Sequence, residues 1–308
     1  MKIVIHLVLS INSLTYARNL IRNYINLSSL PENISFKLYS LDIWAYKLCL
    51  KSELSRNVFL VDSKTQKGSF GHALGLAKCL EQLELGAINI ISDVDVLIVK
   101  ENWDESLKQI FSESTGKSSE AKKVGIVGTT YENISGFSTG SFNFQTYKNK
   151  PTLTWCALSP NYDFTSLNVM PDKTDKTIIE SEDLSDIYGL PIGFTLLKDV
   201  GWQLPLFLHE NGIPYRVFDH VKPTAGESIV LKDAYPYHDE FHFNGIPFLV
   251  HQRGSMKHVY RLDKISRDFY SKVSNYLKNP DWFLGASSID YVNFFYKKTR
   301  RILVKFKK

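Results

Sequence analysis

The stretch INIISDVDVLIVK, residues 88–100, most constrains how this 308-residue chain folds, because two carboxylates follow an apolar run. A strand buried on both faces has an unbroken apolar sequence, which is typical of a parallel sheet covered by helices on both sides. The carboxyl ends of such strands border the ligand crevice of an open α/β sheet. We therefore predict that Asp93 and Asp95 lie at this edge of a sheet.

The spacing of the two carboxylates predicts a metal site. Residues i and i+2 of an extended chain point to the same side, so Asp93 and Asp95 converge while Val94 points into the core. Converging like charges repel one another, and a divalent cation between them removes that repulsion. Because both ligands are hard oxygen atoms, Mg²⁺ or Mn²⁺ is the expected ion. The alternative is that the pair caps the next element or lies in a solvated loop.

Alternating strand and helix patterns predict an α/β fold with a mostly parallel, mixed sheet flanked by helices. Up to residue 100, strands are predicted at 2–10, 34–42, 58–62 and 87–92, and helices at 14–27 and 68–86. Beyond it, strands are predicted at 124–130, 136–145, 151–159 and 246–251, and helices at 102–114, 200–212, 267–279 and 288–308. The acidic stretch 178–186 is predicted to be a solvated loop. No repeat or linker separates two domains, so we expect one domain with a C-terminal helical appendage.

Composition excludes several classes of protein. With 44% hydrophobic residues the chain can bury a full core, and its net charge of +5 does not demand a nucleic-acid partner. The three cysteines are widely separated, so neither a disulfide framework nor a zinc site is indicated, and a reducing compartment fits. The short apolar N-terminal run contains His6 and is interpreted as a strand instead of a signal peptide. No segment approaches the roughly 18 to 20 apolar residues of a membrane span.

The C-terminal stretch FYKKTRRILVKFKK carries seven cations among aromatic and aliphatic residues. This composition is typical of a helix that lies on an anionic membrane surface. The alternative is a helix that packs on the domain and keeps its lysines in water. Nucleic-acid binding is disfavoured because no recognised binding module accompanies the stretch.

A second group of candidate residues follows the predicted strand at 246–251. The segment HQRGSMK contains His251, Gly254 and Lys257 in the pattern H-x-x-G-x-x-K. A neutral imidazole completes a metal's coordination shell, glycine lets the backbone approach phosphates, and an ammonium offsets their charge. The segment HFNG, beginning at His242, is a competing match that lacks the lysine, and we prefer His251.

The third candidate is Asp199, which precedes the helix predicted at 200–212, in which Pro205 should cause a kink or mark the first turn. An aspartate at a helix N-terminus is stabilised by the free backbone N–H groups and by the helix dipole. Asp199 is therefore either a helix cap or a carboxylate presented for general-base catalysis.

Taken together, these motifs resemble those of glycosyltransferases with the GT-A fold, in which a D-x-D motif ends a strand and holds a metal on the donor diphosphate. The resemblance implies that Asp93 contacts the nucleotide ribose or the metal and that Asp95 ligates the metal. H-x-x-G-x-x-K is similar to a segment of retaining, glycogenin-type members, in which the histidine is a third metal ligand and the lysine contacts phosphate. The Pro-Trp that follows it there is replaced here by His258 and Val259.

The segment around Asp199 is similar to one in the inverting glycosyltransferase family 2, where an acidic pair opens a helix. Asp199 takes the position of the catalytic aspartate, and Lys198 stands where the first acid normally does. Since one motif suggests retention and the other inversion, the stereochemistry stays open. The same resemblance implies nucleotide contacts for residues that follow early strands or open the helix before the D-x-D strand, namely Asn12, Asp42, Asp62 and His72.

The resemblance implies a GT-A domain at 1–260, with a nucleotide-sugar half at 1–100, an acceptor half at 101–260, and basic amphipathic helices at 261–308. We expect a metal-dependent hexosyltransferase that uses Mn²⁺ or Mg²⁺, a UDP- or GDP-sugar donor, and a glycan or lipid-linked acceptor hydroxyl. The expected location is cytoplasmic, at the inner face of a membrane. A nucleotidyltransferase is the first alternative, although SINSLTYARN lacks its early glycine-rich motif. A catalytically inactive sugar-nucleotide or carbohydrate-binding protein is the second.

Overall fold

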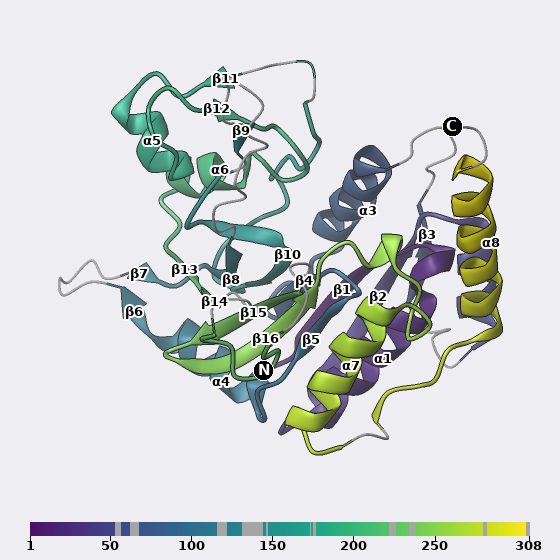
Figure 1. Ribbon diagram of the computed structural model, residues 1–308. Helices are drawn as coiled ribbons and strands as arrows, with labels where there is room; N and C mark the ends of the chain where they lie inside the picture. Colours follow the sequence, from purple (N-terminus) through teal and green to yellow (C-terminus); the bar gives the residue numbers. More distant parts are fainter. Residues whose placement is uncertain are drawn as a thin grey trace. The chain divides into compact units, whose positions relative to one another are not determined.

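The computed structural model describes residues 1–52, 57–61, 68–115, 122–130, 144–145, 147–172, 174, 177–221, 226–233, 238–279 and 282–305. The chain forms two compact units, each assembled from separate stretches (Figure 1). Unit 1 comprises Met1–Val8, Ser29–Asp93 and Asp104–His220, and unit 2 comprises Leu9–Ser28, Val94–Trp103 and Val221–Lys308. The functional boundaries at residues 100 and 260 stay predictions.

Unit 1 is built on a seven-stranded sheet in the order β13-β8-β10-β4-β1-β2-β3. The strands are β1 (Ile3–Leu9), β2 (Ile34–Ser40), β3 (Val58–Leu60), β4 (Ile88–Ser92), β8 (Ile126–Thr130), β10 (Pro151–Leu158) and β13 (Tyr215–Val217). β10 runs antiparallel to both of its neighbours, whereas the pairs β1–β4, β2–β3 and β13–β8 are parallel. The predicted mixed, mostly parallel sheet flanked by helices is confirmed.

Helices and small sheets complete unit 1. The helices are α2 (Ile43–Leu50), α3 (Ser69–Glu81), α4 (Trp103–Ser112), α5 (Glu182–Tyr188) and α6 (Leu204–Glu210). The strands β11 (Thr177–Ile178), β12 (Thr195–Leu196) and β9 (Phe144–Gln145) form a small sheet, and β6 (Ser114–Thr115) pairs with β7 (Lys122–Lys123). α5 lies in the acidic stretch, so the prediction of a loop there is wrong. Ser181 caps this helix, and Gly189 ends it in the left-handed conformation.

A buried histidine joins three strands of this sheet. His6 on β1 lies 3.0 Å from the Tyr39 hydroxyl on β2 and 3.0 Å from Oδ1 of Asn89 on β4. The Asn89 amide donates to the carbonyl oxygens of Glu84 and Ala87, which fixes Oδ1 as an acceptor. His6 therefore donates from Nε2 and accepts the Tyr39 hydroxyl at Nδ1, which makes it a neutral core residue.

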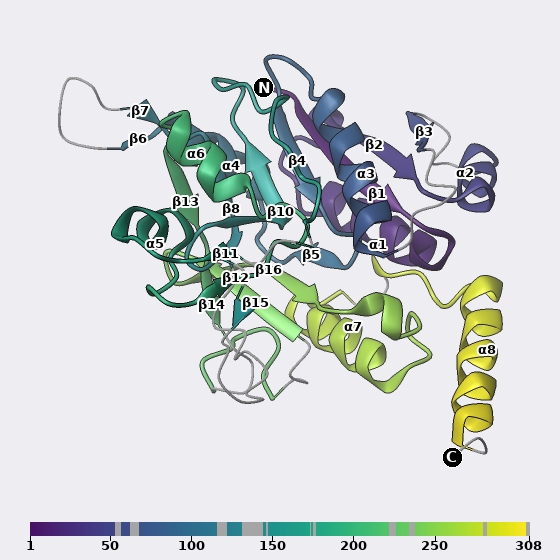
Figure 2. The same ribbon diagram turned by 90° about the horizontal axis from the view of Figure 1, so that it is seen from above.

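Helix α3 packs closely on the sheet of unit 1 because it carries a glycine at the contact (Figure 2). A Cβ atom at Gly75 would lie 2.5 Å from a Val8 side-chain carbon and 3.3 Å from Leu41. Both distances are shorter than ordinary van der Waals contact, so only glycine fits without displacing its neighbours. This packing fixes the first turn of α3, which carries His72, relative to the end of β4.

Unit 2 contains strands β15, β16 and β5 of a four-stranded sheet in the order β14-β15-β16-β5, and only Val221 of β14 belongs to it. The strands of this sheet are β14 (Asp219–Val221), β15 (His238–Phe243), β16 (Ile246–Gln252) and β5 (Val96–Ile98), and the helices of unit 2 are α1 (Leu14–Asn26), α7 (Lys264–Tyr276) and α8 (Ser288–Lys305). The 3₁₀ turns η1 (Ile11–Ser13) and η4 (Ser255–Lys257) also belong to unit 2, whereas η2 (Pro31–Asn33) belongs to unit 1. The sequence predicted α1, β16, α7 and α8 but not β5 or β15.

Two interactions hold the elements of unit 2 together. Asn23 of α1 donates to the carbonyl oxygen of Ile98 and accepts its N–H, so its amide pairs with the edge of β5 as a neighbouring strand would. Tyr16 of α1 packs edge-on against Tyr260 and also contacts Tyr270 of α7, and all three are buried. β5, which starts directly after Asp95, is thereby fixed to a packed core.

None of the helices in the described part of the chain combines the length and the apolar composition that crossing a membrane requires.

Candidate metal and nucleotide site

The two predicted carboxylates lie in the connection between β4 and β5. β4 ends at Ser92, the Asp93 N–H donates to the carbonyl oxygen of Thr154 at 2.8 Å, and Val96 begins β5. The sequence predicted that Asp93 and Asp95 end a strand, and the structure adds that a second strand, in the other sheet, starts immediately after them. Asp93 is the last residue of unit 1, and Asp95 belongs to unit 2.

Within unit 2, strand pairing brings Asp95 to His251. β16 pairs antiparallel with β5 so that His251 lies opposite Val96, and the Gln252 N–H donates to the Asp95 carbonyl oxygen at 3.1 Å. His251 Nε2 lies 3.5 Å from Asp95 Oδ1. Both residues are less than a tenth exposed, which is unusual for ionisable groups unless they are paired or bind a ligand.

Charge compensation shifts the pKa values of both side chains. Burial works to raise the pKa of Asp95, but the His251 charge and hydrogen bonds from His251 and Ser255 bring it below its usual value. Burial works to lower the pKa of His251, but the charges and hydrogen bonds of Asp95 and Asp239 raise it to about 10. Without a cation the pair is a carboxylate facing an imidazolium, and a cation bound at Nε2 would take the place of the proton there.

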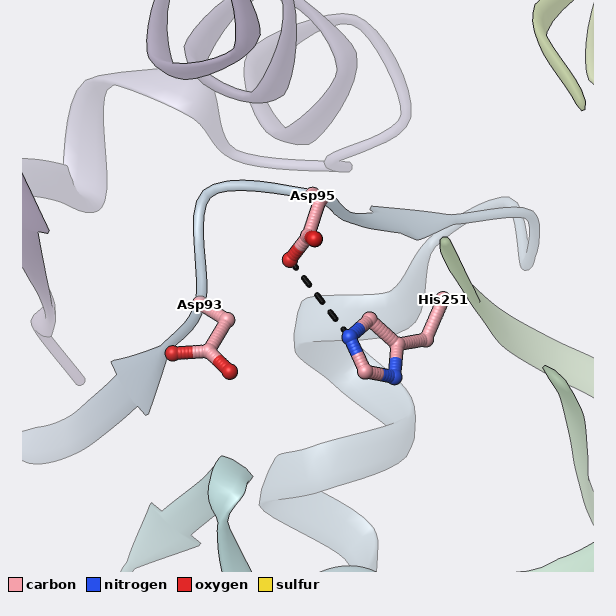
Figure 3. A group of neighbouring side chains, drawn as sticks. All are labelled: Asp93, Asp95 and His251. Atoms are coloured by element: carbon pink, nitrogen blue, oxygen red, sulfur yellow. Dashed lines mark ion pairs between the residues drawn. The ribbon is translucent and has the colours of Figure 1, made fainter. Parts of the chain in front are cut away.

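Asp93, Asp95 and His251 each offer one ligand atom, and these atoms lie within 4.8 Å of one another (Figure 3). Asp93 precedes this buried pair in the sequence, and only Val94 separates it from Asp95. Two carboxylates and one imidazole form a donor set that fits a divalent cation, with coordination positions left for water or phosphate oxygens. The three residues thus offer suitable ligand atoms, and their binding of a metal stays a prediction.

The segment with the pattern H-x-x-G-x-x-K forms a turn that contacts Asp95. Gly254 has φ 69°, the left-handed conformation that glycine adopts at little cost, and it starts the 3₁₀ turn η4. Ser255, buried in this turn, hydrogen-bonds the Asp95 carboxylate. The turn ends at Lys257, which is exposed, and its contact with phosphate stays a prediction. The glycine is needed for the turn itself, whether or not phosphate binds there.

The sequence analysis missed Asp239, which belongs to this site. Asp239 on β15 lies opposite His251 in the strand register, with its Oδ2 3.6 Å from His251 Nδ1. The same oxygen forms an ion pair with Arg253 Nε at 2.7 Å. The segment around Asp239 shows no motif, and only its place opposite His251 in the hairpin of β15 and β16 reveals it.

The alternative histidine, His242, has a different partner. Its Nε2 lies 2.6 Å from Glu240 Oε1, and both side chains are buried. Glu240 also accepts the backbone N–H groups of Ile229, Val230 and Leu231. Burial works to raise the pKa of Glu240, but hydrogen bonds from Ser228, from His242 and from this loop backbone bring it below its usual value. His242 is therefore part of the contact that holds the loop 228–231.

His72 contacts the D-x-D motif inside unit 1. It lies in the first turn of α3, and its Nε2 is 3.5 Å from Asp93 Oδ1. Both side chains are about one-third exposed, so solvent or a ligand can reach them. The predicted contact of His72 with the nucleotide stays a prediction.

The other predicted nucleotide contacts are Asn12, Asp42 and Asp62. Asn12 lies in η1 directly after β1. Asp42 caps α2 by accepting the N–H groups of Trp44 and Ala45, so one of its oxygens already has a structural role. Asp62 lies outside the described residues.

The expectation that Asp199 opens a helix is wrong. α6 starts at Leu204 with Gln203 as its N-cap, and Pro205 occupies its first turn, where a missing N–H costs least. Asp199 lies in the preceding loop and accepts the Val200 N–H at 2.9 Å. Lys198, beside it, is buried with its ammonium 4.6 Å from the centre of the Trp202 ring. The role of Asp199 as a base therefore stays a prediction without support from a helix dipole.

No protein-family model matches this sequence, and no curated protein matches it either. Among solved structures, the chain is similar to the glycosyltransferase GlyE of Streptococcus pneumoniae TIGR4, at 10% identity and TM-score 0.40, over 90% of this chain and 62% of that one. It is similar to the TarS fragment 1–349 of S. aureus in complex with UDP-GlcNAc, at 10% identity and TM-score 0.36, over 90% and 72%.

A further similarity is to the mannosyltransferase PcManGT of Pyrobaculum calidifontis in complex with GDP-Man and Mn²⁺, at 12% identity and TM-score 0.33. It covers 51% of this chain, which spans less than half (44%) of the mannosyltransferase. With identities of 12% or less and TM-scores below 0.5, these similarities carry no functional argument.

Proposed function

We propose that this protein is a glycosyltransferase of the GT-A type, which moves a hexosyl group from a nucleoside diphosphate sugar to a hydroxyl group. The observation that carries the proposal is the buried Asp95–His251 pair of unit 2, with Asp93 two residues before it in the chain. Carboxylates and an imidazole that converge at the end of a strand are suited to a cation that binds phosphate oxygens. The imidazole nitrogen favours Mn²⁺ over Mg²⁺, whose protein ligands are nearly all oxygen atoms.

Each residue then has a defined task. Asp93, Asp95 and His251 would hold the cation, which when bound stabilises the negative charge of the leaving diphosphate. Lys257 offsets the charge of the same phosphates. The donor is a UDP- or GDP-sugar, and the nucleotide contacts proposed for Asn12, Asp42, Asp62 and His72 depend on this function.

Asp199 is proposed as the base that accepts the proton of the acceptor hydroxyl. Its carboxylate is partly exposed in a loop of unit 1, where it is accessible to a substrate. This role implies direct displacement with inversion. The Asp199→Asn variant is expected to bind Mn²⁺ and nucleotide normally while its transfer rate falls at least about 100-fold, and full transfer activity would remove Asp199 from the mechanism.

The acceptor is proposed to be a glycan or glycolipid hydroxyl at the inner face of a membrane. α8 supports this location, because it exposes apolar and basic side chains together: Tyr291, Val292, Phe295, Tyr296, Lys298, Arg300, Arg301, Ile302 and Leu303. Sedimentation with anionic vesicles, but not with neutral ones, is the expected result. Equal recovery with both kinds of vesicle would contradict an electrostatic contact.

The proposed activity is tested by thermal shift and by hydrolysis of UDP-, GDP- and dTDP-sugars, each with and without Mn²⁺. We expect one nucleoside diphosphate to stabilise the protein only when Mn²⁺ is present. Asp95→Asn should abolish this shift and lower kcat/KM at least about 100-fold, whereas the exposed Asp219→Asn serves as a control and should change neither.

Three outcomes separate the alternatives. A metal-dependent shift that persists in Asp95→Asn contradicts the metal assignment. Binding without turnover of any donor indicates a sugar-nucleotide-binding protein. Release of pyrophosphate from a nucleoside triphosphate, instead of transfer from a diphosphate sugar, indicates a nucleotidyltransferase.

A further inference from the structure

The Asp239 side chain lies beside His251. β15 and β16 pair antiparallel, with Asp239 opposite His251. At the end of β16, His251 and Arg253, the residue that follows the strand, both contact Asp239, while the Gln252 side chain donates to Ser266 at 2.7 Å. Asp239 is therefore the acid that the hairpin register places beside both His251 and Arg253.

Asp239 is only 4% exposed, so its charge needs partners inside the protein. Its Oδ2 lies 3.6 Å from His251 Nδ1 and 2.7 Å from Arg253 Nε. The Arg253 side chain is partly exposed, at 43%, so this ion pair links the buried carboxylate to a residue at the surface. The group of residues that converge as ligands contains Asp93, Asp95 and His251 but not Asp239.

The two ring nitrogens of His251 thus face two different carboxylates. Nδ1 faces Asp239, and Nε2 faces Asp95 at 3.5 Å. An imidazole whose Nδ1–H is directed at a carboxylate has its lone pair on Nε2, which is the nitrogen on the side of the ligand group. Carboxylates placed in this way behind a ligating histidine orient the ring and fix its tautomer.

We propose that Asp239, held in place by Arg253, is a positioning residue that directs Nε2 of His251 toward the cation. This inference rests on the proposed function, because it assigns a partner to one of the proposed metal ligands. Asp239 itself neither binds the cation nor touches substrate. Its loss leaves all three ligands in the chain but removes the group that selects the binding nitrogen.

The test measures Mn²⁺ binding directly, through the electron paramagnetic resonance signal of free Mn²⁺, with UDP or GDP present. Asp239→Asn keeps the size of the side chain and removes its charge, and we expect its dissociation constant for Mn²⁺ to rise about 10- to 100-fold. The control Asp219→Asn makes the same substitution at an exposed position and should leave the constant unchanged. A folded Asp239→Asn protein that binds Mn²⁺ within threefold of the parent protein would overturn the inference.

A double-mutant cycle separates positioning from a purely structural role. If Asp239 acts through His251, Asp239→Asn should have almost no further effect on Mn²⁺ binding in a His251→Gln protein. Additive losses would refute the mechanism. If Asp239→Asn does not fold, Arg253→Gln loosens the same carboxylate from a partly exposed position, and an unchanged Mn²⁺ affinity there would also refute it.

Failure of this inference differs from failure of the proposed function. If the parent protein does not bind Mn²⁺ with any nucleoside diphosphate, the proposed function fails. If Asp95→Asn abolishes binding while Asp239→Asn leaves it intact, only the role of Asp239 fails.

Discussion

His6 makes the sheet of unit 1 sensitive to acid, because its ring is buried in the neutral form. Burial, the largest cause, lowers the pKa of His6 from 6.5 to about 4, although the hydrogen bond to Asn89 works in the opposite direction. The folded pKa lies below the unfolded one, so the unfolded chain binds more protons between these values. The stabilisation is therefore fully present above pH 6.5 and is lost as the pH falls through 4.

The size of this effect follows from the pKa values. A fall from 6.5 to about 4 corresponds to roughly 3.4 kcal/mol, of which about 3 kcal/mol is lost by pH 4. This is a large part of the 5 to 15 kcal/mol that is typical of the stability of a whole domain. The pKa of His238 in unit 2 is also lowered to about 4, first of all by burial, so variants are needed to separate the two contributions.

Urea unfolding monitored by tryptophan fluorescence between pH 4 and 7.5 measures the effect of His6. His6→Gln should be less stable than the parent protein at pH 7.5, because two buried hydrogen bonds change, but its stability should fall about 3 kcal/mol less on acidification. The exposed His209→Gln is the matched control and should follow the parent protein. Parallel pH dependences for His6→Gln and the parent protein would refute the assignment of a neutral His6.

Two further predictions concern packing and loop anchoring. Gly128→Ala places a Cβ atom 2.7 Å from a backbone carbonyl oxygen and should cost about 1–3 kcal/mol in urea unfolding. Gly285→Ala, which meets nothing within 4 Å, should change stability by less than about 0.5 kcal/mol; equal losses would contradict the steric argument. Glu240→Gln weakens the acceptor of three backbone N–H groups and should speed amide hydrogen exchange at 229–231, unlike the exposed Glu227→Gln. Unchanged exchange would show that the loop is held by other contacts.

Local pattern was sufficient for most of the main elements. The apolar period of α1 and the continuous apolar runs of β1 and β4 predict these elements within one or two residues. Short elements were missed, because α2 and β5 have too few residues to show a period. α5 was mistaken for a loop because its acidic residues are as typical of a capped first turn as of solvated coil.

The sequence alone identified the chemistry of the site. The spacing of Asp93 and Asp95, and a histidine followed by a glycine and a lysine, identify side chains suited to a cation and to phosphate, because chemical character belongs to the residue itself. It also placed both carboxylates at the end of a buried strand, since the cost of burying charge confines them there.

Tertiary structure alone decided which of these side chains meet. The register of β5 with β16 chooses His251 over His242, and the register of β16 with β15 adds Asp239. The prediction that Asp199 lies at a helix N-terminus was contradicted only by the structure, in which α6 starts at Leu204. Strand register depends on the packing of residues far apart in the chain, and a shift of one residue would turn each of these side chains to the opposite face of the sheet.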